Sequence, residues 1–272
     1  MDRISIPENE VVPMDDVAAG VRGLRVAFVN VFAIIHADGS WTLIDAGLPF
    51  TASAIQNWTR KFTVNAPNAI VLTHGHFDHV SAARDLADAW NVFIYAHPLE
   101  APYLKGQKEY PAPNFAAGGG TMSLLSPLYP RGPVDLGNRL RLFSSDGNST
   151  LAEMPGWEIV HTPGHTPGHV SIFRREDRCL IVGDAFCTTK PESFFEAAIT
   201  QPPEFHGPPA YFTSDWEAAR GSLQLLSQLG AVVVAPGHGQ PLSSADLPEK
   251  LRQLSQYLDE VAVPENRKDN AA

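Results

Sequence analysis

One polar stretch, Thr73-His74-Gly75-His76-Phe77-Asp78-His79, constrains what this chain can fold into more than any other part of the sequence. It places three imidazoles and a carboxylate within six consecutive positions. The stretch directly follows the apolar run 69–72, which is typical of a short buried strand, and a helical pattern begins near Val80. Hydrogen bonds rarely satisfy so many polar groups at one buried place, whereas a divalent metal ion binds all of them. The sequence therefore predicts a metal site between the end of a strand and the start of a helix.

The overall composition limits the classes of partner. Hydrophobic residues make up 44% and charged residues 18% of the 272 positions, which suits a globular chain with a substantial core. Because 20 basic residues face 30 acidic ones without a basic cluster, nucleic acid is not expected as a partner. The expected partner is a small molecule, and self-association to a homodimer stays open.

Cysteine usage and the start of the chain bear on the compartment. Cys179 and Cys187 lack the spacing of a metal motif and are too few for a disulfide scaffold, so we expect reduced thiols. The first residues lack an apolar leader segment, and no run reaches the roughly 20 apolar residues of a membrane span. We therefore expect a cytoplasmic protein without membrane contact.

Alternating strand and helix signals predict the architecture. Where strand, helix and strand follow one another, the two strands are expected to pair in parallel. Two such halves indicate two mixed sheets packed between helices, in a single domain over 1–262 with a flexible tail over 263–272. Thr51 or Ser53, and Thr213 or Ser214, are the expected helix caps. Strands are expected at 25–35, 41–44, 69–72, 92–96, 157–162, 170–174, 179–183 and 231–235, and helices at 51–62, 80–90, 213–229 and 245–260.

Two irregular segments interrupt this pattern. Residues 98–150 are rich in proline, glycine and scattered aromatics, and we expect them to form a flap over the site. The alternative is a surface insertion without a role. Phe194-Phe195 and the segment 201–212 either line the site or pack against the core, and the sequence does not separate the two.

Metal-type residues recur at the ends of other predicted strands. His165 lies in the run His161-Thr162-Pro163-Gly164-His165-Thr166-Pro167-Gly168-His169, Asp184 follows the strand 179–183, and His238 follows the strand 231–235. Such strand ends are where sites gather in layered α/β folds. Seven ligands exceed the four of one tetrahedral ion and fit two ions that share a carboxylate and a water. The candidate ligands are His74, His76, Asp78, His79, His165, Asp184 and His238.

Taken together, these motifs resemble the metallo-β-lactamase superfamily of hydrolases, over residues 25 to 260. The resemblance implies a four-layer αβ/βα sandwich with two divalent ions, zinc in the first place and manganese or iron as alternatives. It implies that His74, His76 and His165 hold one ion and that Asp78, His79 and His238 hold the other, with Asp184 bridging. Hydrolysis would then proceed through a hydroxide shared by the two ions, with Asp78 and Asp184 as the catalytic carboxylates.

The sequence departs from the true β-lactamases of that family. Those enzymes commonly use a cysteine ligand, whereas Asp184 stands at the matching strand end and Cys187 lies three residues beyond. A lactone or another carboxylic ester is slightly favoured as substrate because the predicted flap is apolar and aromatic. The lactonase branch of that family usually supplies a tyrosine near the bridging aspartate, and the absence of a tyrosine after Asp184 until Tyr211 therefore counts against a lactone. A thioesterase, a phosphodiester hydrolase and an iron-dependent oxidoreductase stay open.

The remaining polar residues receive supporting roles. Asp45, at the end of the strand 41–44, is expected to hold a ligand histidine in place. His169 is expected to support the site or to start a strand rather than to bind metal. For His97 a place in the site stays open. Purely structural roles are expected for His36, His161, His206, Trp157 and Trp216.

Overall fold

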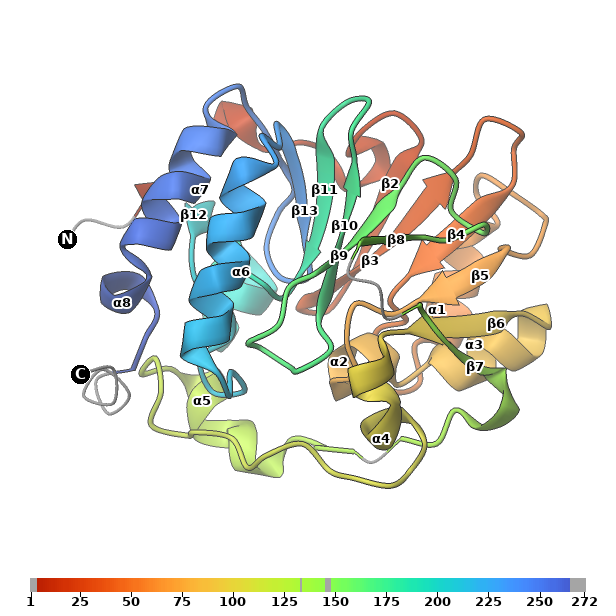
Figure 1. Ribbon diagram of the computed structural model, residues 1–272, viewed down its shortest axis with the longest axis horizontal. Helices are drawn as coiled ribbons and strands as arrows, with labels where there is room; N and C mark the ends of the chain where they lie inside the picture. Colours follow the sequence, from red (N-terminus) through yellow and green to blue (C-terminus); the bar gives the residue numbers. More distant parts are fainter. Residues whose placement is uncertain (1–3, 133, 145–147, 265–272) are drawn as a thin grey trace.

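The structure is a computed structural model that describes residues 4–132, 134–144 and 148–264. Within those ranges, two six-stranded sheets face each other (Figure 1). The first sheet runs antiparallel through its first three strands and parallel from the third strand onward. Its order is β2 (Val21–Val26), β3 (Val29–Ile35), β4 (Trp41–Ile44), β5 (Ala69–Val71), β6 (Phe93–Ala96) and β7 (Leu140–Leu142).

The second sheet is also mixed. Its only parallel pair among the described residues joins β11 to β13, and the other neighbours are antiparallel. A separate two-stranded pair joins β1 (Ile4–Ser5) to β12 (Glu204–Phe205). The order of the second sheet is β14 (Leu242–Ser243), β13 (Val233–Pro236), β11 (Cys179–Gly183), β10 (Val170–Arg174), β9 (Glu158–His161) and β8 (Asn148–Thr150).

Helices and short turns complete the described chain. The α-helices are α1 (Ala52–Thr59), α2 (Phe77–Val80), α3 (Ala83–Trp90), α4 (Ala101–Leu104), α5 (Thr121–Leu125), α6 (Trp216–Gln228), α7 (Leu247–Gln256) and α8 (Leu258–Val261). Single turns of 3₁₀ helix lie at Glu8–Glu10, Met14–Asp16, Pro98–Glu100, Ser126–Leu128 and Gly137–Arg139, and a π-helical turn lies at Glu196–Thr200.

Three buried clusters hold the layers together. Along β3, Val31 and Ala33 pack outward against α1 and α3, whereas Phe32 and Ile34 pack inward against the second sheet. This alternation is the period of two that a strand covered on both faces requires. The outer face of the second sheet packs against α6 and α7, which lie together on the left of Figure 1. The predicted four-layer αβ/βα sandwich is therefore confirmed.

Several predicted element boundaries were wrong. The apolar run 25–35 is not one strand, because the chain reverses at Ala27, whose φ is +58°, and β2 pairs with β3 across that turn. The helix predicted over 80–90 is present as α3 but begins at Ala83, because the separate short helix α2 ends before it, where the Ser81 hydroxyl donates to the Phe77 carbonyl. The cap of α6 is Asp215, whose carboxylate accepts from the Ala218 N–H, rather than Thr213 or Ser214.

The α1 cap was also wrong. Thr51 stands at the predicted position, but its hydroxyl donates to the carbonyl of Leu48 instead of accepting from the helix, and Ser53 lies inside the helix. The helix therefore begins without a side-chain cap.

Parts of the segments predicted as a flap and as a tail belong to the sheets and the core. Residues 140–142 and 148–150 are strands of the first and second sheets, so the irregular part of the flap ends before Leu140. At the other end of the chain, Val263 is buried in the cluster beneath α7 and does not belong to a tail. The rest of the predicted tail, 265–272, lies outside the described residues.

The helices of the described chain are short in terms of membrane thickness. None of them has both the length and the apolar character that a bilayer-spanning segment needs.

Candidate metal centre

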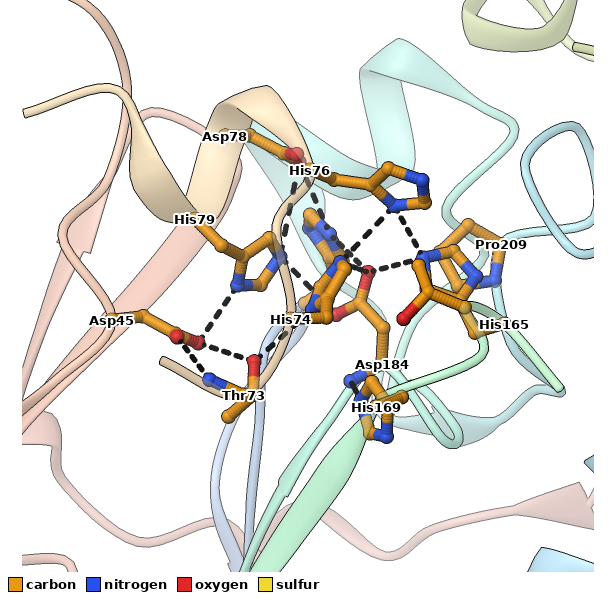
Figure 2. Close-up of polar contacts among 12 residues, drawn as sticks. Asp45, Thr73, His74, His76, Asp78, His79, His165, His169, Asp184 and Pro209 are labelled. Carbon is orange, nitrogen blue, oxygen red and sulfur yellow. Dashed lines mark hydrogen bonds and ion pairs between the residues drawn. The ribbon is translucent and has the colours of Figure 1, made fainter. Parts of the chain in front are cut away.

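The predicted histidine cluster occupies the connection between β5 and α2. Its Thr73 is held by Asp45, which follows β4: the backbone N–H of Thr73 donates to Asp45 Oδ1 at 2.8 Å, and its hydroxyl donates to Oδ2 at 2.8 Å. The φ of Asp45 is +59°, a left-handed conformation that aspartate tolerates better than most residues. This turn directs the carboxylate back toward the cluster, as Figure 2 shows.

Three other loops bring the remaining candidate ligands to the same place. His165 lies between β9 and β10, Asp184 directly follows β11, and His238 follows β13. Backbone hydrogen bonds join the two sheets here, since Val170 N–H donates to the Thr73 carbonyl at 2.9 Å. The strand ends named by the sequence therefore meet at one edge of the sandwich.

The seven candidate ligands converge in three overlapping groups of buried side chains, in each of which the ligand atoms lie within 4.8 Å of one another. Asp184 lies among the imidazoles, as Figure 2 shows for His74, His79 and His165. Its Oδ2 is 3.5 Å from Nε2 of His165 and 3.2 Å from Nε2 of His238. The groups are His74, His76 and His165; His74, His79 and Asp184; and Asp78, His79 and His238.

The donor set is poorly satisfied by hydrogen bonds alone. His79 Nε2 and Asp184 Oδ1 are buried and have no hydrogen-bond partner among the described residues, although they lie 3.4 Å apart. His76 Nδ1 lies 3.1 Å from Nε2 of His74 and 2.8 Å from Nε2 of His165, so three ring nitrogens face one another. Buried polar atoms without partners are costly, and imidazole and carboxylate are common ligands of divalent cations. The residues present therefore fit bound divalent metal ions.

Partners outside the cluster fix the tautomer of four of the rings. The hydroxyl of Thr73 donates to Asp45 and can only accept from His74, whose Nδ1 is 3.1 Å away. In the same way Nδ1 of His79 lies 2.8 Å from Asp45, and Nδ1 of His238 lies 2.8 Å from the carbonyl of Phe28. With the proton on Nδ1, each ring presents the lone pair of Nε2 to the centre.

His165 is held in the same tautomer through two successive hydrogen bonds. The hydroxyl of Thr213 donates to the carbonyl of Pro209 at 2.8 Å, so it accepts from Nδ1 of His165 at 3.1 Å. His76 is the exception, because it directs Nδ1 rather than Nε2 toward its neighbours.

Burial keeps one set of imidazoles neutral. It lowers the pKa of His76 to about 3. Burial, reinforced by neighbouring imidazoles, also holds the pKa values of His74 and His165 well below the ordinary value. These three rings are in the state in which imidazole binds metal.

Neighbouring carboxylates reverse the effect of burial on the pKa of His79. Burial alone would lower the pKa of His79, but Asp184 and Asp45 outweigh it and raise that pKa well above its ordinary value. Conversely, burial alone would raise the pKa of Asp184, but the imidazoles of His238 and His79 hold it well below its usual range. Burial raises the pKa of Asp78. Positive charge is thus favoured beside Asp184, whether a proton or a metal ion supplies it.

The two supporting residues that the sequence proposed contact the cluster. Asp45 holds His79, as expected, and also Thr73. His169 is not a member of the three ligand groups: its Nε2 accepts from the backbone N–H of Asp184 at 2.8 Å, and its Nδ1 is 2.8 Å from the Thr162 hydroxyl. It therefore fixes the backbone from which Asp184 projects.

Replacing Asp45 with Asn is expected to weaken metal binding about 10–100-fold, the usual cost of losing a partner behind a ligand. The amide nitrogen would face Nδ1–H of His79 and favour the tautomer with its proton on Nε2, which blocks the ligand position. Competition with a chromophoric chelator measures this. The matched control is His36→Ala, which removes a buried ring bonded to Thr42 away from the cluster. Equal affinities in both variants would contradict the assignment.

The metal-free protein is expected to lose stability as the pH falls below 6.5. Burial lowers the pKa of His76 to about 3 and that of His169 to about 4, so the unfolded chain takes up protons first. Each such histidine costs about 1.4 kcal/mol per pH unit below its unfolded pKa. The raised pKa of His79 acts above 6.5, where its stabilisation is lost as the pH rises, and does not change this slope.

Urea unfolding in the presence of a chelator, at pH 7, 6 and 5, measures this slope. The His169→Gln variant should lose about one proton of the pH dependence, because one buried neutral imidazole is gone. A wild-type stability that stays level or rises between pH 6.5 and 5 would contradict the prediction.

The other histidines lie outside the three ligand groups. His97 stacks on His161, with ring centroids 4.2 Å apart, and Nε2 of His161 donates to the carbonyl of Pro167 at 2.9 Å. Nε2 of His206 is 3.6 Å from a carboxylate oxygen of Glu192. Trp157 is buried between the sheets, and Trp216 packs at the edge of the outer core. None of these observations gives His97 a place in the cluster.

Phe194-Phe195 and the segment 201–212, whose place near the site or in the core the sequence did not decide, differ in the structure. Phe194 and Phe195 are exposed rather than buried. Phe212, by contrast, packs against His76 with ring centroids 4.7 Å apart. The end of the segment 201–212 therefore borders the metal centre, whereas the two phenylalanines neither pack in the core nor contact the cluster rings.

Two tyrosines of the irregular segments lie near the cluster, although the sequence did not single either of them out. Burial, with the charges of Asp78 and Asp184 adding to it, raises the pKa of Tyr211 well above its ordinary value. Tyr129 packs on Phe77 at 5.5 Å, and burial and Asp78 raise its pKa as well. Tyr211, the first tyrosine after Asp184 in the sequence, thus lies close enough to the cluster for the charges of Asp78 and Asp184 to act on it. No local spacing signal marks either residue.

Known proteins resemble this chain over most of its length. A model of the metallo-beta-lactamase superfamily matches residues 24–238. The probable metallo-hydrolase YflN of Bacillus subtilis is 37% identical over 253 residues, which cover 90% of this chain and 94% of YflN. Hydroxyacylglutathione hydrolase GloC of Haemophilus influenzae is 26% identical over 62% of this chain and 68% of its own length.

Among solved structures, the di-iron-bound form of TTHA1623 superposes with a TM-score of 0.54 and 25% identity, over 84% of this chain and 96% of that one. The family model spans most of the chain, and YflN matches it almost end to end. The chain thus belongs to the metallo-beta-lactamase superfamily and is one of its metallo-hydrolases.

Proposed function

We propose that this protein is a dinuclear metal-dependent hydrolase of a small ester-like substrate, with a lactone or another carboxylic ester favoured. The position of Asp184 carries the proposal. Its Oδ2 lies 3.5 Å from Nε2 of His165 and 3.2 Å from Nε2 of His238, and its Oδ1 lies 3.4 Å from Nε2 of His79. A carboxylate so close to imidazoles of both proposed ion sites suits a ligand shared by two ions. Two adjacent cations form a hydrolytic device.

The ligand groups suggest how the ions divide the side chains. His74, His76 and His165 would hold the first ion. Asp78, His79 and His238 would hold the second, and Asp184 would touch both. Seven ligand residues are more than one tetrahedral ion accommodates, which favours two ions over one.

The chemistry is then shared between the ions and the chain. Two bound divalent cations would supply a water of lowered pKa as nucleophile and positive charge for the oxygen that becomes negative. Asp184 is held as an anion by His238 and His79. Asp78, besides holding the second ion, would orient the reacting water through its carboxylate.

Aromatic groups favour an uncharged carbonyl substrate. Phe212 packs against His76, and Tyr129 lies between Phe77 and Tyr211, with ring centroids 5.5 and 6.3 Å away. Because their pKa values are raised, both tyrosines keep their hydroxyl protons at neutral pH and can donate to a carbonyl oxygen. Such groups suit an ester or lactone better than a phosphodiester, for which cationic side chains beside the two ions would be the better partners.

A thioester is the second candidate, favoured by the similarity to GloC, a hydroxyacylglutathione hydrolase. Zinc is our proposed metal, and the di-iron form of TTHA1623 makes iron the alternative to test.

The test loads metal-free protein separately with zinc, manganese and iron. Each form is assayed with an acyl-homoserine lactone, an aryl acetate, an acyl thioester and bis-p-nitrophenyl phosphate, and oxygen uptake is followed in parallel. Faster turnover of the lactone or acetate supports the proposal, and a preference for the thioester selects the second candidate. Oxygen consumption by the iron form without hydrolysis of any ester would overturn it.

A further inference from the structure

A buried carboxylate outside the seven candidate ligands connects three segments of the site. Glu100 ends the 3₁₀ turn after β6 and is fully buried. Its Oε1 accepts from the Thr166 hydroxyl at 2.8 Å and from the Gly168 N–H at 2.7 Å. Its Oε2 accepts from the Gly75 N–H at 3.0 Å and from the hydroxyl of Tyr110.

Each oxygen serves one loop of the metal centre. Gly75 separates His74 from His76, and Thr166 directly follows His165. The rings that these loops carry meet where His76 Nδ1 lies 2.8 Å from His165 Nε2. Glu100 thus spans the two loops directly behind the contact between their ligands.

The third segment comes from the irregular region after β6. Tyr110 donates to Glu100, and its ring packs against His76 with centroids 4.5 Å apart. Tyr110 also stacks on Tyr103, at 3.9 Å and an interplanar angle of 10°. The position of this segment is therefore linked to the first ligand loop through the same carboxylate.

Only a carboxylate meets this set of partners. Two backbone N–H groups and two hydroxyls converge on it, and an ionised carboxylate has acceptor lone pairs on both oxygens, whereas an amide presents N–H donors on one side. The loops also approach it very closely. A Cβ at Gly168 would lie 2.7 Å from Glu100 Cγ, and one at Gly75 would lie 2.5 Å from the Tyr110 hydroxyl.

The ligands assigned to the second ion are anchored by different residues. His79 is held by Asp45, and the loop of His238 is held by Asn30, whose amide donates to the carbonyls of Pro236 and Gly239 at 2.9 and 2.7 Å. No hydrogen bond to Glu100 from these ligands is found among the described residues.

We propose that Glu100 is the positioning residue of the first metal site: it sets the spacing between the loops that carry His76 and His165 and couples that spacing to Tyr110. The inference rests on the proposed pair of sites. It goes beyond that pair because it assigns the support of one site, and not of the other, to a residue that touches no ligand atom.

The test measures metal affinity rather than turnover. Metal-free wild-type and Glu100→Gln protein are titrated with Co²⁺ and Zn²⁺ against a chromophoric chelator. We expect one ion to bind about 10–100-fold more weakly in the variant and the other to bind as in wild type. The matched control is Glu192→Gln, another fully buried carboxylate, which accepts from the Ala210 N–H and touches neither ligand loop.

Double variants identify which site weakens. A His238→Ala background retains the ligands assigned to the first ion, and adding Glu100→Gln there should weaken binding of the remaining ion. A His165→Ala background retains the ligands assigned to the second ion, and the same change there should leave the affinity unchanged. Equal losses in both backgrounds, or a lower melting temperature with unchanged affinities, would overturn the proposal.

Milder variants keep the test open if Glu100→Gln does not fold. Thr166→Val and Tyr110→Phe each remove one donor to the carboxylate, and each should weaken the first site less than Glu100→Gln does. Thr166→Ser keeps the hydroxyl and should restore wild-type affinity. Thr42→Val, which removes a buried hydroxyl bonded to the Glu153 carbonyl away from the cluster, should lower stability alone.

The two proposals fail in different ways. If wild-type protein binds a single ion, the dinuclear assignment is wrong, and the affinity of that ion in Glu100→Gln still decides the role of Glu100. If wild-type protein binds two ions and Glu100→Gln binds both unchanged, the dinuclear assignment stands and the role of Glu100 is wrong.

Discussion

Replacing Asp184 with Ala is expected to lower turnover by about a thousandfold or more. The proposed ions stabilise the transition state by several kcal/mol, and each 1.36 kcal/mol of that stabilisation that is lost lowers the rate tenfold. The variant loses the carboxylate that approaches imidazoles of both ligand groups, Oδ2 lying 3.5 Å from His165 and 3.2 Å from His238. It also leaves His79 and His238 without the anion that raises their pKa values. Metal content should fall below two ions per chain.

Metal analysis and steady-state kinetics on the preferred substrate check this expectation together. His36→Ala is the control, and it should keep both metal content and turnover because His36 contacts Thr42 rather than the cluster. Full activity of Asp184→Ala would rule out a bridging role, and loss of metal from His36→Ala would show that a ligand had been misassigned.

Replacing Gly237 with Ala is expected to disturb the centre from the backbone side. The new Cβ would lie 2.2 Å from Asp184 Oδ1 and 2.9 Å from Cε1 of His79, so both side chains must shift. Neither can move freely, because Asp184 is buried among the ligands and His79 is tied to Asp45. A displacement near 1 Å in a catalytic constellation costs about a hundredfold in rate, and we expect a loss of this size.

Gly221→Ala provides the matched control for this variant. Gly221 lies within α6, and a Cβ there meets no atom within 4 Å. It should raise stability by about 0.5–1 kcal/mol, the usual difference between glycine and alanine in a helix, and leave metal content unchanged. Kinetics, metal analysis and thermal unfolding of the two variants make the comparison. A Gly237→Ala protein with wild-type rate and metal content would contradict the close packing described above.

The convergence of the candidate ligands could be predicted because its signals are local. The run from His74 to His79 is too polar for an ordinary core, and each of His165, Asp184 and His238 directly follows or closely follows an apolar strand. Strand ends of a layered fold gather at one edge, so residues placed there meet whatever the details of the loops.

Asp45 and His169 were predicted to support the site from their places beside the motifs, whereas Glu100 and Tyr211 could not be singled out in this way. Glu100 lies 25 residues from Gly75 and 68 residues from Gly168 along the chain, and no periodicity connects them. Tyr211 reaches the site from the segment before α6. Their roles depend on contacts between distant segments, which single-residue preferences do not encode.

The boundaries that were wrong also have a physical cause. The turn at Ala27 uses a left-handed residue that is neither glycine nor asparagine, so the apolar run 25–35 carries no visible break. Strands β7 and β8 are three residues each, too short to give a periodic signal, and each pairs with the edge of a larger sheet.

Residue order alone predicts the candidate metal ligands and the layered fold, because both depend on residue type and on periods of a few positions. Folding in three dimensions settles which nitrogen of each ring faces the centre. The tautomer is set by Asp45 for His79, by the carbonyl of Phe28 for His238 and by Thr213 for His165. These three partners come from separate parts of the chain and each bonds to Nδ1 of its ring. A proton has one place on a neutral imidazole, and its position is set by whichever acceptor the fold brings within hydrogen-bond distance.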